Sequence, residues 1–435
     1  MEQATELERR RQAAKTTTTS GLARANRFAV AIMFSLALAF VFAAYVGAGI
    51  GEQPGPTPSA AVEVEGPRLG GDYAAFYGAG SIVWNGDIDS LYDPAVQTAA
   101  QVGLGLDGFL AFAYPPHVAV VYAPLGALPF QVSWLIHTLF MAATLIATVV
   151  VLAPVVPLIQ RNKLPLMAAG LTFYPLLVAV GGGQNAPLTV LGFAIIWRAL
   201  HDDREWLAGL IAGLMMYRPQ YALAAMGLML LSRHWRAVAT AVVTSALTWT
   251  VTALFLGADW VGQWLDAVIP FVEEDAVVNA DNSISAIGFM QAIWPNESDF
   301  AVGIGVAIAV VVVLTLMFLW VQPDRFTLAD RMGSLAIGSV LISPHTQFYD
   351  ASTLLIAGAA VLAATDRDAV PVKFFALVWL ATLIHRTAEP IGATPLALVV
   401  VASFFAMVVA TIKRPGSQEP VTALPIDSPN QNMAA

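Results

Sequence analysis

The chain has 435 residues, of which 57% are hydrophobic and only 12% are charged. Soluble domains carry roughly twice that fraction of charged residues, so the composition excludes an ordinary soluble protein and indicates an integral membrane protein. The net charge is −9 and no basic stripe suited to nucleic acid is present. The absence of cysteine excludes disulfides, thiolate metal sites and a cysteine nucleophile.

A basic tail, residues 1–27, opens the chain, and a polar tail, residues 413–435, closes it; we expect both to be disordered. Between them, residues 28–412 form the membrane domain. The first apolar run exceeds the roughly 7–15 residues of a signal-peptide core, so we expect it to remain as a membrane helix. The pattern predicts an all-α polytopic bundle with about twelve transmembrane or re-entrant helices, at 28–50, 130–153, 164–181, 185–201, 206–217, 219–232, 236–257, 301–321, 329–343, 350–364, 371–386 and 393–412.

The runs on either side of Tyr217-Arg218-Pro219 are too short to cross a membrane as straight helices. Non-helical backbone at membrane depth is tolerated only where it faces protein or water. This pair therefore predicts a broken or re-entrant hairpin with Arg218 at its tip.

The basic residues indicate the orientation. Arg9, Arg10, Arg11, Lys15, Arg24 and Arg27 precede the first helix, which predicts a cytoplasmic N-terminus. Counting crossings forward brings most later Lys and Arg residues to the same side, and it places the C-terminus there too. Two long segments, 51–117 and 258–300, fall on the outer side; the first has one basic residue and the second has none. We expect a bacterial inner-membrane protein whose functional site lies on the extracytoplasmic face.

The first outer segment carries most of the motifs. Asp72 begins a stretch whose apolar and aromatic residues recur every three or four positions, which predicts a helix on the membrane surface from Tyr73 to Trp84. Asp93, followed by a proline, predicts a turn or a helix start. Tyr114-Pro115-Pro116-His117 ends the segment.

The order of these motifs resembles glycosyltransferase family 87. The similarity covers about residues 70 to 350 and is carried by Gly71-Asp72-Tyr73, Phe76-Tyr77, Leu91-Tyr92-Asp93-Pro94, Tyr114-Pro115-Pro116, Gly183-Gln184-Asn185, Ala208-Gly209-Leu210, Tyr217-Arg218-Pro219-Gln220, Arg233-His234-Trp235-Arg236, Asn282-Ser283-Ile284-Ser285 and Ser343-Pro344. Two features depart from the family pattern. Arg218-Pro219 replaces the usual Lys-Pro, and Tyr349-Asp350 stands where many members have two histidines.

The resemblance implies a GT-C membrane fold and transfer of a sugar, such as mannose or arabinofuranose, from a polyprenyl phosphate to an envelope glycan or lipid acceptor. Such a reaction needs a base for the acceptor proton and a cation for the departing phosphate. We assign Asp72 as the catalytic base and Arg218 as the phosphate-binding residue. Gln184, Asn185 and Tyr114 are expected to position the sugar donor. No cofactor or metal is predicted, because the lipid phosphate already leaves readily.

The same side chains also have structural interpretations. Asp72 and Asn185 each precede a predicted helix and are suited to cap it, and Arg218 is suited to satisfy hairpin carbonyls. A further set is included as substrate-binding candidates, although anchoring or packing roles explain them equally well: Tyr77, His117, Gln220, His345 and Asp350. The run Glu273-Glu274-Asp275 contains oxygen ligands suited to a divalent cation, but such a run usually decorates a solvated loop.

Two other functions fit the same bulk properties. A transporter or flippase of lipid-linked sugars also has broken helices and a central cation, but the sequence shows no internal repeat. A non-catalytic partner in envelope synthesis is the third interpretation, and the presence of Asp72 argues against it. The expected partners are a lipid-linked sugar donor, a glycan or glycolipid acceptor and membrane lipid, with no nucleic acid.

Overall fold

The computed structural model describes residues 71–102, 110–279, 282–364, 372–388 and 395–413. Within these residues the chain is helical, and its one β-type pairing is an isolated antiparallel bridge between Ser283 and Gln347. The prediction of an all-α protein is confirmed. The predicted helix at 28–50 and the predicted tail at 1–27 lie outside the described residues. So does the tail predicted at 413–435, except for Lys413, which is the last residue of a helix.

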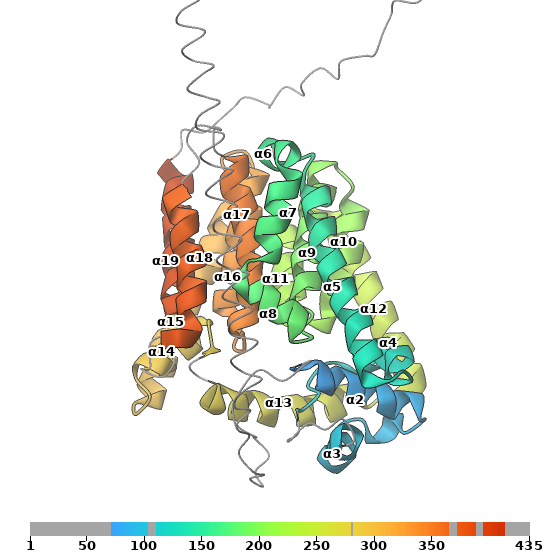
Figure 1. Cartoon of the computed structure of the whole chain (residues 1–435). Coiled ribbons are helices and arrows are strands. Elements are labelled where there is room, and N and C mark those ends of the chain that lie inside the picture. Colours follow the sequence, from blue (N-terminus) through green and yellow to red (C-terminus); the bar gives the residue numbers. More distant parts are fainter. Residues whose placement is uncertain (1–70, 103–109, 280–281, 365–371, 389–394, 414–435) are drawn as a thin grey trace, which may run out of the picture.

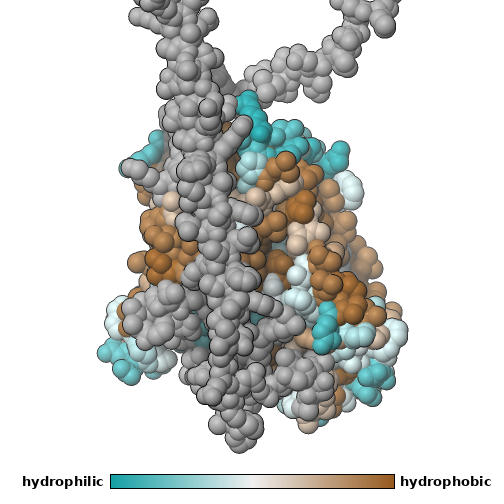
Figure 2. Space-filling view, in the orientation of Figure 1, coloured by the Kyte–Doolittle hydropathy of each residue, from teal (hydrophilic) through white to brown (hydrophobic). Residues whose placement is uncertain are grey.

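Most helices stand side by side in one bundle (Figure 1), and the face of it seen in Figure 2 has apolar side chains in the middle and hydrophilic side chains at the two ends. The bundle contains α5 (Phe130–Leu152), α6 (Pro157–Arg161), α7 (Lys163–Leu171), α8 (Tyr174–Gly181), α9 (Ala186–His201), α10 (Glu205–Leu214), α11 (Pro219–Leu231), α12 (Trp235–Leu256), α15 (Ser298–Trp320), α16 (Leu328–Ile342), α17 (Leu354–Ala363), α18 (Val372–Ala388) and α19 (Pro395–Lys413).

The predicted number of membrane crossings is not confirmed. Among the described residues, four helices (α5, α12, α15 and α19) are long and apolar enough to cross a membrane, or five spans if α7 and α8, bent by 66°, count as one. Five further apolar helices have 10–17 residues. Prolines explain two of the breaks, because Pro175 and Pro219 occupy the first turns of α8 and α11, where a missing N–H is tolerated.

The predicted hairpin at Arg218 is present as two short helices. α10 continues into a 3₁₀ turn, η2 (Met215–Tyr217), and α11 begins at Pro219. Small residues bring α10 against α12: a Cβ added to Gly209 would meet the Ala237 carbonyl oxygen at 2.0 Å. This close packing fixes the hairpin, and therefore fixes the depth of its tip in the bundle.

The outer segments gather at the end of the bundle opposite α6, where α13 lies across its base (Figure 1). They form α2 (Tyr73–Trp84), η1 (Ile88–Ser90), α3 (Pro94–Val102), α4 (Pro116–Gly126), α13 (Trp260–Val278) and α14 (Ala286–Ile293). A 3₁₀ helix, η4 (Phe348–Thr353), comes later in the chain, directly before α17. The helix predicted from Tyr73 to Trp84 is confirmed, and so is the helix start at Asp93, whose Oδ1 accepts a hydrogen bond from Ala95 N at 2.8 Å.

Two features of this end differ from the sequence-based expectation. α4 was not predicted; it packs against α2 so closely that a Cβ on Gly126 would meet Ser81 N at 2.3 Å. The Glu273-Glu274-Asp275 run belongs to α13 and not to a loop. Helical geometry separates its members, because Glu273 and Glu274 are exposed whereas Asp275 is turned toward the bundle.

Candidate active site

The turn between α8 and α9 locks the start of α2 in place. Tyr73 N donates a hydrogen bond to the Gly182 carbonyl oxygen at 3.2 Å. Gly183 has φ +78°, and a Cβ there would lie 2.2 Å from Tyr73 Cβ. Only glycine permits both this backbone conformation and this approach. The contact holds Asp72, the residue before α2, directly beside Gln184.

Asp72 is directed at Gln184 and not at its own helix. It occupies the N-cap position of α2, yet its side chain makes no capping hydrogen bond. Its Oδ2 instead accepts a hydrogen bond from Gln184 Nε2. Burial raises the pKa of the Asp72 carboxyl, and the Gln184 hydrogen bond offsets part of that effect. Because the side chain is only partly enclosed, Asp72 combines an elevated basicity with access from outside.

Arg218 enters the same site from the tip of the α10–α11 hairpin. Its Nη1 forms an ion pair with Asp350 Oδ1, and both side chains are 5% exposed. Its Nη2 lies 3.1 Å from the Tyr114 hydroxyl and 3.4 Å from Gln184 Oε1. The rings of Tyr114, Tyr221 and Tyr349 surround the guanidinium, each 5.9 Å from its central carbon.

Gln184 therefore joins the predicted base to the predicted cation. Its partners fix its amide orientation, since the N–H group must face the Asp72 carboxylate and the oxygen must face the Arg218 guanidinium. One side chain thus separates the two groups that a phosphate-displacing transfer requires. The distance between them is set by a planar amide and not by a mobile loop.

Tyr114 and Asn185 complete the wall of the site. The Tyr114 hydroxyl lies 3.4 Å from Gln184 Oε1 and 3.3 Å from Asn185 Oδ1. Asn185 stands at the N-cap of α9 but makes no side-chain capping bond, so its oxygen is directed to Tyr114. The backbone of this segment is anchored by α13, because Trp264 Nε1 donates to the Ala113 carbonyl oxygen at 3.0 Å.

The structure does not connect all the candidate residues to this cluster. The Tyr77 hydroxyl donates to the Leu128 carbonyl oxygen at 2.8 Å. Burial lowers the pKa of His117 to about 4, and its Nδ1 has no hydrogen-bond partner among the described residues. The described part of the chain also shows no hydrogen bond or ion pair from the Gln220 side chain to the cluster. Any substrate contact by these three residues remains a prediction.

His345 does reach the site, together with a residue that the sequence did not single out as a site residue. His345 Nδ1 lies 3.2 Å from Asp275 Oδ2, which also accepts from Gln347 Nε2 at 2.6 Å. Asp275 comes from α13, more than sixty residues away in sequence. The sequence alone showed only that it follows two glutamates. Across the described residues, no group of three or more His, Cys, Asp or Glu side chains has the arrangement of a metal site.

Comparison with known proteins assigns the chain to a family. The family model of glycosyltransferase family 87 matches residues 112–344, more than half of the sequence. The chain belongs to glycosyltransferase family 87. The matched range contains Tyr114, Gln184, Asn185, Arg218 and Asp275, whereas Asp72, His345 and Asp350 lie outside it.

One curated relative is a polyprenol-phosphate-mannose-dependent alpha-(1-2)-phosphatidylinositol pentamannoside mannosyltransferase of Mycolicibacterium smegmatis. It is 32% identical over 155 residues, which are 34% of this chain and 36% of the relative. The match therefore spans about a third of the relative's length.

Proposed function

We propose that this member of glycosyltransferase family 87 transfers a sugar from a polyprenyl-phosphate donor to a hydroxyl of an envelope glycan or glycolipid. The observation that carries the proposal is the Asp72–Gln184–Arg218 chain, in which one amide links a partly accessible carboxylate to a buried cation. Mannose is the first sugar to test, because it is the one in the relative's name; arabinofuranose is the second. A GT-C fold and a bacterial inner-membrane location with cytoplasmic termini belong to the same proposal.

In the proposed reaction, the acceptor hydroxyl oxygen attacks the anomeric carbon of the sugar. The bond from that carbon to the phosphate oxygen breaks, and the phosphate keeps the electron pair. Asp72 takes the hydroxyl proton, and its raised pKa makes it a stronger base than an exposed aspartate. Arg218 stabilises the departing phosphate through charge-assisted hydrogen bonds.

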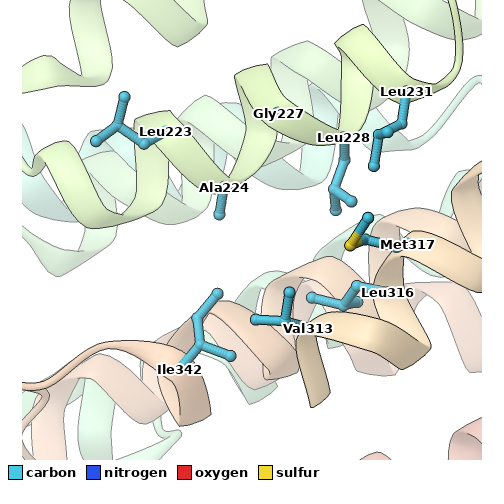
Figure 3. Close-up of a pocket in the computed structure, with 9 residues that line it drawn as sticks. All are labelled: Leu223, Ala224, Gly227, Leu228, Leu231, Val313, Leu316, Met317 and Ile342. Atoms are coloured by element: carbon cyan, nitrogen blue, oxygen red, sulfur yellow. The ribbon is translucent and has the colours of Figure 1, made fainter. Parts of the chain in front are cut away.

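An apolar groove provides a place for the polyprenyl chain. It has a volume of ≈ 210 Å³ and runs between α11 and α15 (Figure 3). Its walls are Leu223, Ala224, Gly227, Leu228, Leu231, Val313, Leu316, Met317 and Ile342. The groove follows α11, whose N-cap is Arg218, so a phosphate at Arg218 and an isoprenoid chain in the groove would belong to one extended ligand.

The decisive experiment compares sugar transfer by the purified full-length chain and by Asp72→Asn, using polyprenyl-phosphate mannose and polyprenyl-phosphate arabinose. General-base catalysis contributes about 10²- to 10⁴-fold, and a loss of that size in a folded Asp72→Asn protein is expected. Asp89→Asn is the matched control, because Asp89 is an exposed carboxylate of the same outer segment. Equal rates in wild type and Asp72→Asn would exclude Asp72 as the base.

The same preparation tests the alternatives. Movement of labelled polyprenyl-phosphate sugar across vesicle membranes, without transfer to any acceptor, would favour a flippase. If the protein shows no transfer and no movement of the lipid, a non-catalytic partner in envelope synthesis is favoured.

A further inference from the structure

The imidazole of His345 is held by two residues on one face of α13. Its Nδ1 lies 3.2 Å from Asp275 Oδ2. The ring of Phe271, one helical turn before Asp275, meets the imidazole edge-on at a centroid distance of 5.8 Å. The 345–347 segment is itself tied down, because Ile284 N donates to the Thr346 carbonyl oxygen at 3.1 Å. His345 thus has a defined position and a defined ring plane.

The partners of Asp275 determine which nitrogen of His345 carries the proton. Asn279 Nδ2 donates to Oδ1 at 2.6 Å, and Gln347 Nε2 donates to Oδ2 at 2.6 Å. A carboxylate that receives these bonds is an acceptor toward the imidazole as well, so Nδ1 must donate. In the neutral ring the lone pair is then on Nε2. The described residues offer Nε2 no hydrogen-bond partner, and the side chain is 26% exposed.

Relative to the Arg218–Asp350 pair, His345 and Asp275 are less buried. Both are close enough to influence the Asp72 carboxyl electrostatically, and so is Arg218. Arg218 and Asp350 are 5% exposed, whereas Asp275 is 13% and His345 is 26% exposed. Asp72 therefore has two different neighbours, a deeply buried cation at the N-cap of α11 and a more accessible imidazole held by α13.

We propose that His345 and Asp275 bind the acceptor: His345 Nε2 accepts a hydrogen bond from a second hydroxyl of the acceptor glycan, next to the hydroxyl that Asp72 deprotonates. In this arrangement Asp275 is a positioning residue, which fixes the tautomer and the orientation of His345. The proposal rests on the glycosyl-transfer function proposed above. It assigns the two sides of Asp72 to different substrates, with the lipid phosphate at Arg218 and the acceptor at His345.

Steady-state kinetics of the full-length chain distinguish the two sides. With a synthetic short-chain dimannoside as acceptor, His345→Ala is expected to raise the acceptor KM about tenfold, the effect of one lost hydrogen bond of good geometry. The KM for the lipid-linked sugar should change less than twofold. Asp275→Asn should reproduce most of this effect, and the double variant should be no worse than His345→Ala. Additive losses, or a rise in the KM of the lipid-linked sugar instead, would overturn the assignment.

A second pair in the chain serves as the matched control. His201 Nδ1 lies 3.1 Å from Asp202 Oδ1, with the His201 side chain 53% exposed, at the C-terminal end of α9. His201→Ala should leave both KM values unchanged. If it behaves like His345→Ala, the effect is general and not that of an acceptor site.

A binding readout separates this inference from the proposed reaction. In protein labelled with ¹⁵N-histidine, the two ring resonances lost in His345→Gln are those of its Nδ1 and Nε2, and their couplings to the carbon-bound ring hydrogens distinguish them. In the neutral ring the Nε2 resonance should have the chemical shift of an unprotonated nitrogen. It should change in Asp275→Asn and move when the dimannoside is added without any sugar donor. Absence of the dimannoside-induced change overturns the inference whether or not the protein transfers sugar. A dimannoside that binds at His345 but is never glycosylated would instead refute the reaction and leave the binding site intact.

Discussion

Replacing Gly183 by alanine tests whether the α8–α9 turn holds the base in position. The new Cβ would lie 2.2 Å from Tyr73 Cβ, 2.7 Å from its Cα and 2.8 Å from its N, and these neighbours include backbone atoms that cannot rotate away. The left-handed conformation at φ +78° costs a residue with a side chain about 1–2 kcal/mol. Overpacking adds about 1–3 kcal/mol, so the variant should lose roughly 2–5 kcal/mol of stability.

The chain can relieve this clash in two ways, and both are measurable. If the turn stays in place, the apparent Tm of the purified protein falls. If α2 moves away from the turn, Asp72 loses its hydrogen bond to Gln184 and sugar transfer falls while Tm changes less. Gly181→Ala is the control, because no atom lies within 4 Å of a Cβ at that position. A Gly183→Ala protein with the Tm and transfer rate of Gly181→Ala would refute the reasoning.

Three further predictions concern charge and lipid binding. Because burial raises the Asp72 pKa above 3.8, transfer should fall as the pH drops through that raised value. The raised pKa stabilises the folded state below pH 3.8, and this stabilisation is lost as the pH rises through the pKa of the folded state. Asp72→Asn should therefore gain thermal stability relative to wild type toward neutral pH, and a pH-independent difference in Tm would contradict this. Asp350→Ala should cost about 3–5 kcal/mol by leaving Arg218 buried without its counter-charge, and the added Arg218→Met change should recover part of the lost Tm; additive losses would refute the pairing. Gly227→Trp places a large side chain in the apolar groove and should raise the KM of a long-chain sugar donor roughly tenfold, the equivalent of about two buried CH₂ groups. The KM of a short-chain donor should not change. Gly303→Trp on α15 is the control, since a Cβ at either glycine has no atom within 4 Å.

The helices were largely predictable because their signals are local. Apolar runs predict where helices form, and Pro219 predicts the break at Arg218, whereas the break between α7 and α8, inside the single run expected at 164–181, was not predicted. The observed α5, α9, α11 and α12 lie within a few residues of the expected ranges. The number of membrane crossings was not predictable in the same way. A short apolar helix looks alike in sequence whether it spans, re-enters or packs at one end, and tertiary contacts such as Gly209 against Ala237 decide between these arrangements.

The site was only half visible in the sequence. Asp72, Gln184 and Arg218 stand in short motifs, so their types and neighbours suggested chemistry. Their connection was not visible, since it depends on a turn that only Gly183 allows and on an amide that faces two partners at once. Asp275 was hidden for a different reason: it lies in an acidic run, and only the helical geometry of α13 separates it from Glu273 and Glu274.

The pairing of Arg218 with Asp350 changes what the cation has to do. An unpaired guanidinium would attract a phosphate with its full positive charge, but this one already has a buried counter-charge. A phosphodiester that approaches it meets Asp72 and Asp350 as well, so attraction in the ground state is weak. During the proposed transfer, Asp72 loses its negative charge on taking the acceptor proton, while the departing phosphate gains one. The negative charge thus moves across Gln184 toward Arg218, and the cation stabilises the transition state more than the bound substrate. Such differential stabilisation is what accelerates a reaction, and it explains why a buried ion pair stands at this point of the site.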